Sequence, residues 1–199
     1  MYNRLLLFNE RQKNVGLERC ANDWVLSLDA DEALSAHLKK EISIIKSAPE
    51  PGISGYSFPR CVFFEGRWIR HGDWYPDRLV RLFKRSKAEF RGDKVHERLH
   101  LEGEVGQLNG EIEHYSFKSD EDQKNRMTHY SELWAESQFE NGNRPGILSP
   151  YTHAFWSFFR GFFLRAGFMG GRTGWIIAKT NAVGVYFKYS RLRAMWKAK

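Results

Sequence analysis

Hydrophobic and polar positions in the first part of the chain predict a helix, a strand and a second helix. Residues 9–21 follow a weakly amphipathic helical pattern, and the apolar run 24–28 is typical of a short buried strand. Apolar residues then recur at helical spacing over 34–45, which predicts a helix of about 12 residues. The prolines and glycine of 49–52 end that helix.

The pattern changes to short β-rich pieces over residues 55–117. Runs such as GYSFPRCVFFEGRW and RLVRLFKR are separated by glycines and by the sequence YPD. Residues 120–140 return to a helical pattern, which NGNRPG ends. The order strand, helix, several strands, helix is typical of an α/β architecture. A nucleotide-binding α/β domain normally opens with a strand, whereas this sequence opens with a helix, so we expect the first part of such a domain to be absent.

Composition and charge divide the sequence into a body, residues 1–143, and a tail, residues 144–199. The 199 residues suffice for a substantial core, and 42% hydrophobic with 28% charged residues exclude a disordered chain and a membrane channel. The net charge of +7 is uneven, because the tail holds ten Lys or Arg and no Asp or Glu. The two cysteines have no metal-binding or redox spacing, which favours a reducing compartment.

A group of carboxylates follows the apolar run 24–28. Carboxylates at the carboxyl end of an α/β strand lie over the crevice where ligands bind. Asp29 and Asp31, one residue apart, can share a hard cation such as Mg²⁺ or Mn²⁺. The alternative is an acidic turn that stabilises the positive N-terminus of the following helix. A calcium loop is excluded because Ala33 and Leu34 replace the oxygen ligand and the glycine that it needs.

The segment HERLH fits the H-E-x-x-H template of zinc metalloproteases, with His96 and His100 as ligands and Glu97 as base. That template needs a helix, and the flanking glycines leave little length for one. In a strand, Glu97 shares a face with Val95 and Leu99, and both histidines point the other way. The pattern favours the strand, and the protease is the alternative.

Aromatic residues cluster around Gly72 and Asp73, where Trp68, Trp74 and Tyr75 occur. Exposed aromatic rings beside carboxylates suit sugars, although ordinary half-buried packing is the alternative for each ring. A lone histidine such as His114, in IEHYSF, is commonly structural.

The tail interleaves Phe and Trp with Arg and Lys. It contains no run of 18 apolar residues, so it is not expected to span a bilayer. The pattern favours helices that lie on an anionic membrane, and Trp156, Trp175 and Trp196 are of the kind that settles at headgroup depth. Single-stranded nucleic acid and simple packing on the body are the alternatives. Nucleic acid is not expected, because clusters such as FWSFFRGFFL are too apolar for its groove.

Taken together, these segments resemble the family 2 glycosyltransferases of GT-A fold, in particular the bacterial lipopolysaccharide-core β-glycosyltransferase branch. RQKNVGLERCANDWVLSLDADE is similar to that branch's helix, strand and Asp-x-Asp segment. GYSFPR, GDWYPDRLVRLFKR, VHERL and IEHYSF resemble its acceptor-side region, and ENGNRPGILSPYTHAFWSFFRGFFL resembles its C-terminal tail. The resemblance covers essentially the whole sequence. It implies a Rossmann-like mixed sheet, N-terminally truncated because the segment that grips the nucleotide base is absent, with a helical basic-aromatic tail.

The resemblance also implies roles for particular residues. Asp29, Asp31 and His114 would hold Mg²⁺ or Mn²⁺ against the diphosphate of a nucleotide sugar. Glu97 would be the catalytic base, although the family's usual Glu-Asp pair reads His-Glu here, and Asp77 is the reserve candidate. Substrate-binding positions are expected at Gly72, Asp73, Trp74, Tyr75 and Arg81.

The implied activity is inverting glycosyl transfer, in which the base deprotonates an acceptor hydroxyl that attacks the anomeric carbon. The expected partners are a nucleotide-sugar donor and a lipid-linked saccharide acceptor. Residues 144–199 are expected to hold the protein on the cytoplasmic face of the bacterial inner membrane. The alternative from another class is a non-catalytic membrane-surface remnant of such an enzyme.

Overall fold

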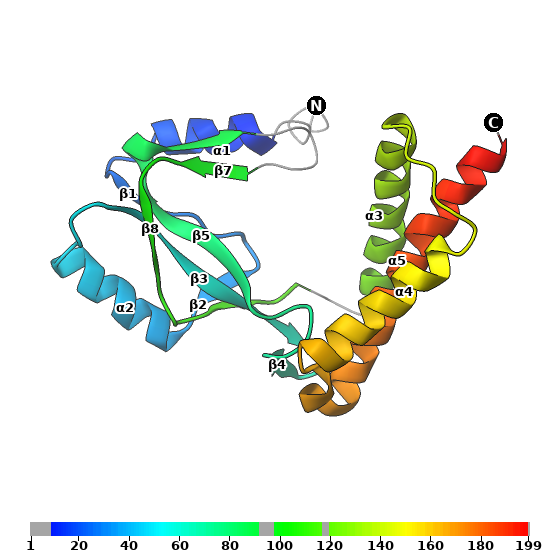
Figure 1. Ribbon diagram of the computed structural model, residues 1–199. Coiled ribbons are helices and arrows are strands. Elements are labelled where there is room, and N and C mark those ends of the chain that lie inside the picture. The colour runs from blue at the N-terminus through cyan, green and yellow to red at the C-terminus, as the bar shows by residue number, and fades with distance from the viewer. Residues whose placement is uncertain (1–8, 92–97, 117–119, 199) are drawn as a thin grey trace. The chain divides into compact units, whose positions relative to one another are not determined.

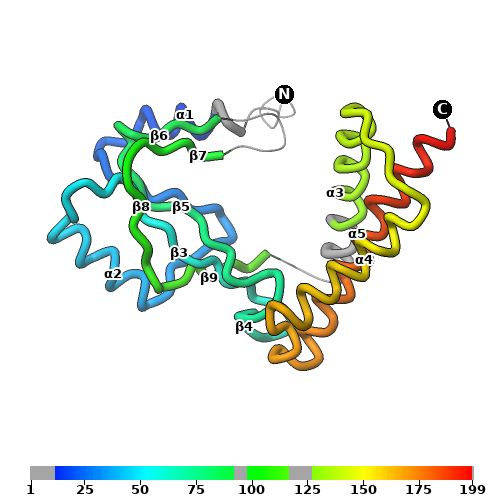
Figure 2. Tube along the Cα trace, viewed as in Figure 1, coloured from blue at the N-terminus to red at the C-terminus, as the bar shows by residue number. Residues whose placement is uncertain are grey.

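A computed structural model describes residues 9–91, 98–116 and 120–198. These residues form two compact units. The first contains the chain up to Arg60 together with Asp77–His114, and the second contains Cys61–Pro76 together with the chain from Tyr115 onward. Each unit is traced in Figures 1 and 2. The division differs from the predicted boundary at residue 143, because the helix before that boundary packs with the tail helices.

The first unit is built on a mixed sheet. Its strand order is β1 (Trp24–Leu26), β5 (Asp77–Lys84), β3 (Ile53–Phe64), β9 (Ile112–His114) and β2 (Glu32–Leu34). Neighbours in the pairs β1–β5, β3–β5 and β2–β9 run antiparallel, whereas β8 (Glu104–Gln107) pairs with β3 in parallel. The predicted α/β class is confirmed, and the mixed sheet is compatible with a Rossmann-like glycosyltransferase fold.

Strand β1 is shorter and less buried than the apolar run 24–28 predicts. It covers Trp24–Leu26, and all three residues are half-buried. The reason is its position, since β1 is the last strand in the order and pairs with β5, where Val25 lies opposite Phe83. The run therefore marks an edge strand and not a fully buried one.

The helix predicted over 34–45 is confirmed as α2 (Ala36–Ser47), with a different start. Ser35 is its N-cap and accepts a hydrogen bond from the Leu38 backbone N–H at 3.2 Å. Leu34 belongs instead to β2, where it pairs with Ile112. The chain therefore makes a turn after β1 and enters a second short strand before the helix begins.

The core of the first unit lies between α2 and the sheet. Its buried residues are Leu38, Ile45, Tyr56, Phe58, Leu82, Leu108 and Ile112. A second cluster joins Leu17 of α1 (Asn9–Glu18) to Phe83 and Phe90. Phe90 lies in β6 (Ala88–Arg91), which follows the short 3-10 helix η1 (Arg85–Lys87) and pairs with β7 (Arg98–Leu101).

Strand β7 argues against the alternative of a zinc protease. His100 lies in this strand opposite Glu89, so the described part of HERLH is extended, as predicted, and the helix that the protease template needs does not run through it. His96 and Glu97 lie outside the described residues.

The second unit is mainly helical, as predicted for the tail. It contains α3 (Asp120–Glu140), α4 (Ser149–Phe159), the π-helical turn η2 (Arg160–Leu164), the 3-10 turn η3 (Gly167–Gly170) and α5 (Gly171–Ala198). Helix α5 packs against both α3 and α4. The far end of β3 and its partner β4 (Arg67–Ile69) also belong here, and Phe64, Ile69 and Ile177 form a small core.

Glycines allow the close packing of this unit. A Cβ atom at Gly174 of α5 would collide with the backbone of Gly167, and one at Gly184 would press on the Met127 side chain of α3. Among the described residues, none of the helices combines the length and apolar character needed to cross a bilayer.

Candidate functional site

The carboxylates that follow β1 enter a network of ion pairs in the first unit. Arg81 Nη2 of β5 lies 2.7 Å from Asp29 Oδ2 and 3.0 Å from Glu32 Oε1. The Glu32 side chain has no exposed surface, and its Oε2 accepts the Asp29 backbone N–H at 3.0 Å. Burial alone would raise the pKa of Asp29, but the hydrogen bond and charge of Arg81 outweigh it and hold the pKa below its usual value.

Arg60 extends this network to Asp77, the reserve candidate for the base. Arg60 donates from Nη2 and Nε to Asp77 Oδ2 at 2.6 and 3.1 Å, and its Nη1 lies 3.5 Å from Glu32 Oε1. Both bonds to Asp77 use the same oxygen, and none of the described residues donates to Oδ1 on this side chain, which is 41% exposed. One carboxylate oxygen of Asp77 is therefore available to accept a proton.

Asp31 and His114, two of the three residues expected to hold a metal, lie close together. Asp31 Oδ2 is 3.3 Å from His114 Nε2 of β9, and strand pairing of β2 with β9 sets His114 opposite Glu32. His114 is 11% exposed in its side chain, and its buried Nδ1 has no hydrogen-bond partner among the described residues. A carboxylate accepts, so the ring donates its Nε2–H to Asp31 Oδ2. A cation held by both groups would replace this hydrogen bond and take the Nε2 lone pair, with the ring proton on Nδ1.

The separation of this pair would also suit two adjacent ligands of a hard cation. Two ligand atoms that each lie about 2.1 Å from an octahedral ion at right angles are about 3.0 Å apart, close to the observed separation. Asp29, the third predicted ligand, is instead bound by Arg81. In the part of the chain that the structure describes, no group of three or more His, Cys, Asp or Glu is arranged to hold a metal. Mg²⁺ commonly uses one or two protein carboxylates and takes its remaining ligands from phosphate and water.

The predicted substrate-binding residues separate into the two units. Arg81 belongs to the ion-pair network of the first unit, whereas the loop of residues 72–75 belongs to the second. In that loop Gly72 has φ of 84° and donates its N–H to the Arg165 carbonyl at 2.9 Å. Asp73 is 8% exposed and accepts from Arg160 Nε and Nη2, each at 3.2 Å. The tail helices therefore hold this loop in place.

Asp73 and Trp74 line a pocket of about 540 Å³ between the helices of the second unit. Tyr75, also in the loop, is half-buried. Sequence reasoning missed Glu32, Arg60 and the pocket-lining Arg160 as site residues. Their signals were present, since Glu32 follows the Asp-x-Asp directly and Arg160 interrupts an aromatic run, where an arginine needs a partner.

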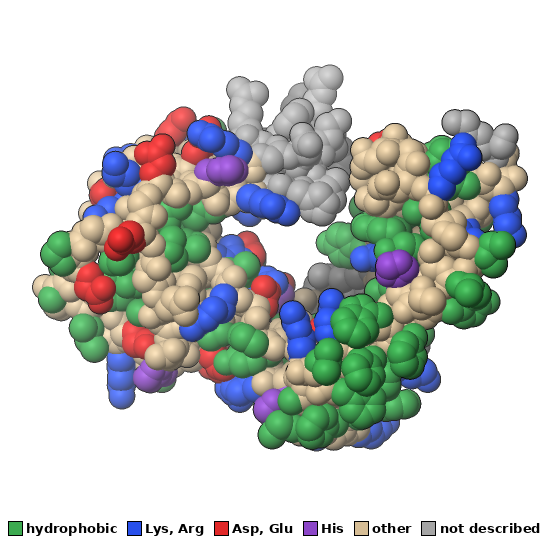
Figure 3. Space-filling view, in the orientation of Figure 1, with side chains coloured by type: hydrophobic (Ala, Val, Ile, Leu, Met, Phe, Trp, Pro, Cys, Tyr) green, Lys and Arg blue, Asp and Glu red, His purple; other side chains and the backbone are tan. Residues whose placement is uncertain are grey.

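The helical unit also exposes an apolar surface. Figure 3 shows hydrophobic side chains gathered over the end of α4 and the turns that follow it. Its members, each between 49% and 69% exposed, are Phe155, Trp156, Phe163, Leu164, Phe168, Met169 and Trp175. Trp196 differs, because its Nε1 donates to the Asn143 carbonyl and the Arg144 guanidinium lies 4.2 Å from its ring. Two of the three tryptophans predicted at headgroup depth are thus exposed, while Trp196 is half-buried against the loop after α3.

Known proteins similar to this chain are glycosyltransferases. No family model matches the chain. An uncharacterized glycosyltransferase of Rickettsia prowazekii is 28% identical over 192 residues, which cover 92% of this chain and 66% of the relative. An uncharacterized glycosyltransferase of Rickettsia bellii is 27% identical over 195 residues, with the same coverage. The lipopolysaccharide core biosynthesis glycosyltransferase LpsC of Rhizobium meliloti is 29% identical over 188 residues, 90% of this chain and 69% of LpsC.

The chain is thus a relative of named glycosyltransferases along nine tenths of its length, which confirms the relationship predicted from the sequence. It spans about two thirds of the length of the relatives that it matches.

Proposed function

We propose that this chain takes part in the transfer of a sugar from a nucleotide-sugar donor to a saccharide acceptor of the lipopolysaccharide core. The observation that supports this most is the Asp31–His114 pair beside the Arg81-bound Asp29, in a chain similar to named glycosyltransferases. LpsC, one of these relatives, is named for lipopolysaccharide core biosynthesis.

Asp31 and His114 would hold Mg²⁺ or Mn²⁺. Such a cation supplies positive charge that stabilises the diphosphate leaving group. Asp29 then has a positioning role, because its bond to Arg81 and the Glu32 bond to its N–H fix the turn that carries Asp31. Glu32 contacts two guanidinium groups and holds the side chains of Arg60 and Arg81 next to each other.

The proposed transfer inverts the anomeric centre. A carboxylate takes the proton of the acceptor hydroxyl, and the acceptor oxygen forms a bond to the anomeric carbon. The bond from that carbon to the nucleoside diphosphate breaks, and its electron pair leaves on the phosphate oxygen. Glu97 is the first candidate for this base and Asp77 is the second. Asp77 Oδ1, to which none of the described residues donates, would be the oxygen that takes the proton.

The proposed acceptor is lipid-linked, and the apolar surface would place the protein on the cytoplasmic face of the inner membrane. Seven large apolar side chains are exposed along one segment, and a contiguous apolar surface of this kind commonly marks a membrane or protein contact. The ten Lys or Arg of 144–199, with no acid among them, would attract anionic lipid headgroups.

The test uses the full chain, a panel of nucleotide sugars, purified rough lipopolysaccharide and Mn²⁺, and measures nucleoside diphosphate release. We expect release that needs the metal and the acceptor, and a loss of at least about 100-fold in Asp31→Asn and His114→Gln. His37→Gln is the matched control, because His37 is 67% exposed on α2 and pairs there with Glu41.

Equal release by wild type and Asp31→Asn would refute the metal site. A chain that binds anionic vesicles but releases no nucleoside diphosphate from any donor would be the non-catalytic remnant, and the transfer would be refuted.

A further inference from the structure

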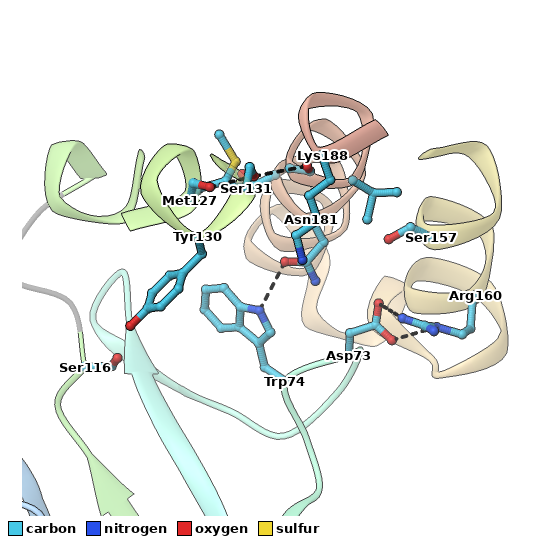
Figure 4. Close-up of a pocket in the computed structure, with 13 residues that line it drawn as sticks. Asp73, Trp74, Ser116, Met127, Tyr130, Ser131, Ser157, Arg160, Asn181 and Lys188 are labelled. Carbon is cyan, nitrogen blue, oxygen red and sulfur yellow. Dashed lines mark hydrogen bonds and ion pairs between the residues drawn. The ribbon is translucent and has the colours of Figure 1, made fainter. Parts of the chain in front are cut away.

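The pocket of the helical unit contains hydrogen-bond donors that the proposed metal and base do not use (Figure 4). Arg160 holds Asp73 with Nε and Nη2, which form one edge of its guanidinium. Nη1, on the other edge, donates to none of the described residues. The charge of Asp73 is thereby compensated, while one side of Arg160 remains available to a ligand.

Asn181 of α5 also presents its donor to this pocket. Trp74 Nε1 lies 3.3 Å from Asn181 Oδ1, and an indole nitrogen can only donate. The amide oxygen is therefore the atom that faces Trp74, and the NH₂ group of Asn181 is left to donate elsewhere. Figure 4 shows both side chains at the same pocket as Arg160 and Lys188.

Lys188 lies about two helical turns after Asn181 on α5 and lines the same pocket. Its ammonium lies 5.9 Å from the Trp134 ring, and no carboxylate among the described residues pairs with it. Burial lowers the pKa of Lys188, because a partly desolvated ammonium is less stable than a fully hydrated one. A bound anion would restore that lost stabilisation, since an opposite charge favours the protonated form.

The remaining lining suits a sugar ring. Trp74 is half-buried with its ring at the pocket, and Tyr130 of α3 is 58% exposed beside it. The hydroxyl groups of Ser157 and Thr180 add short polar partners of the kind that sugar hydroxyls need. Aromatic faces beside donors of this type are chemically suited to a saccharide.

We propose that this pocket binds a saccharide that carries an anionic group, a phosphate ester in the first place. Lys188 and Arg160 would neutralise the anion, Asn181 would donate to it, and Trp74 would pack on the ring. The assignment rests on the proposed function, because it gives the acceptor of that transfer a site on the helical unit.

Binding of glucose 6-phosphate, glucuronic acid, glucose and inorganic phosphate to the full chain tests this proposal by calorimetry at low salt. We expect glucose 6-phosphate to bind at least tenfold more tightly than glucose or inorganic phosphate. Lys188→Gln and Asn181→Asp are each expected to weaken that binding about tenfold. The first removes a charge-assisted hydrogen bond to the anion, and the second places a carboxylate that repels the anion. Asn181→Asp keeps the shape of the side chain and the oxygen that accepts from Trp74.

Lys179→Gln is the matched control, because Lys179 is an exposed residue of the same helix outside the pocket, and we expect no change. Glucuronic acid that binds as tightly as glucose 6-phosphate supports the proposal with a carboxylate as the anion. Unchanged affinity in both pocket variants, or inorganic phosphate that binds as tightly as the sugar phosphate, would overturn it. Asp31→Asn is expected to leave this binding intact, so failure of the metal site and failure of the pocket are distinguishable.

Discussion

Replacement of Glu32 by Gln probes the buried ion-pair network with the smallest change in shape. The Glu32 carboxylate accepts from Arg81 Nη2 at 3.0 Å, from the Asp29 N–H at 3.0 Å and from Arg60 Nη1 at 3.5 Å, and its side chain has no exposed surface. Hydrogen bonds to a charged group contribute about 1.5–3 kcal/mol each. Both arginines keep a second carboxylate and Gln keeps one oxygen, so we expect the free energy of unfolding of the first unit to fall by about 2–3 kcal/mol.

Hydrogen exchange measured by mass spectrometry reports the stability of the first unit separately from that of the second. A loss of this size corresponds to exchange about 30–150-fold faster for those amides of β3 and β5 that exchange by unfolding. Glu104→Gln is the control, because Glu104 is an exposed residue of β8, and we expect it to change stability by less than about 0.5 kcal/mol. Equal exchange in the two variants would show that the network does not hold the site together.

Three further predictions concern charge, packing and the membrane. Because the pKa of Asp29 is depressed in the folded state, Asp29→Asn should lower stability near pH 7, and the difference from wild type should shrink as pH falls below about 3.9 in urea titrations; a pH-independent difference would contradict this. Gly174→Ala should destabilise the helical unit by about 1–3 kcal/mol in thermal unfolding because its Cβ would strike backbone, whereas Gly16→Ala, with open space around it, should not destabilise. Phe155→Ser with Phe163→Ser should reduce sedimentation with anionic vesicles at high salt without changing the circular dichroism; binding that salt alone abolishes would refute insertion of these rings.

The long periodic elements of this fold could be predicted from the sequence. Residues 120–140 carry enough helical turns to give a readable period, and α3 has those bounds. Helix α2 was readable because Leu38 and Ile45 recur on its buried face. The Asp31–His114 proximity came from the resemblance, whose motifs carry spatial information that spacing alone lacks.

Features that depend on distant partners could not be read in the same way. A strand of three residues such as β2 has no period, and its existence depends on pairing with β9 about eighty residues later. The burial of β1 likewise depends on its place at the end of the strand order. The Asp73–Arg160 pair joins a loop to a helix across 87 residues, and the grouping of α3 with the tail follows from its packing on α5, which composition does not reveal.

In the proposed transfer, Asp31 and His114 would together hold one divalent cation that stabilises the diphosphate of the donor. Pulsed electron paramagnetic resonance of Mn²⁺ bound to the full chain, with a nucleotide sugar present, tests it directly. We expect a ¹⁴N coupling from the His114 imidazole together with ³¹P couplings from the donor, and loss of the ¹⁴N coupling in His114→Gln but not in His37→Gln. Mn²⁺ that shows ³¹P couplings and no imidazole nitrogen in the wild-type chain would contradict it.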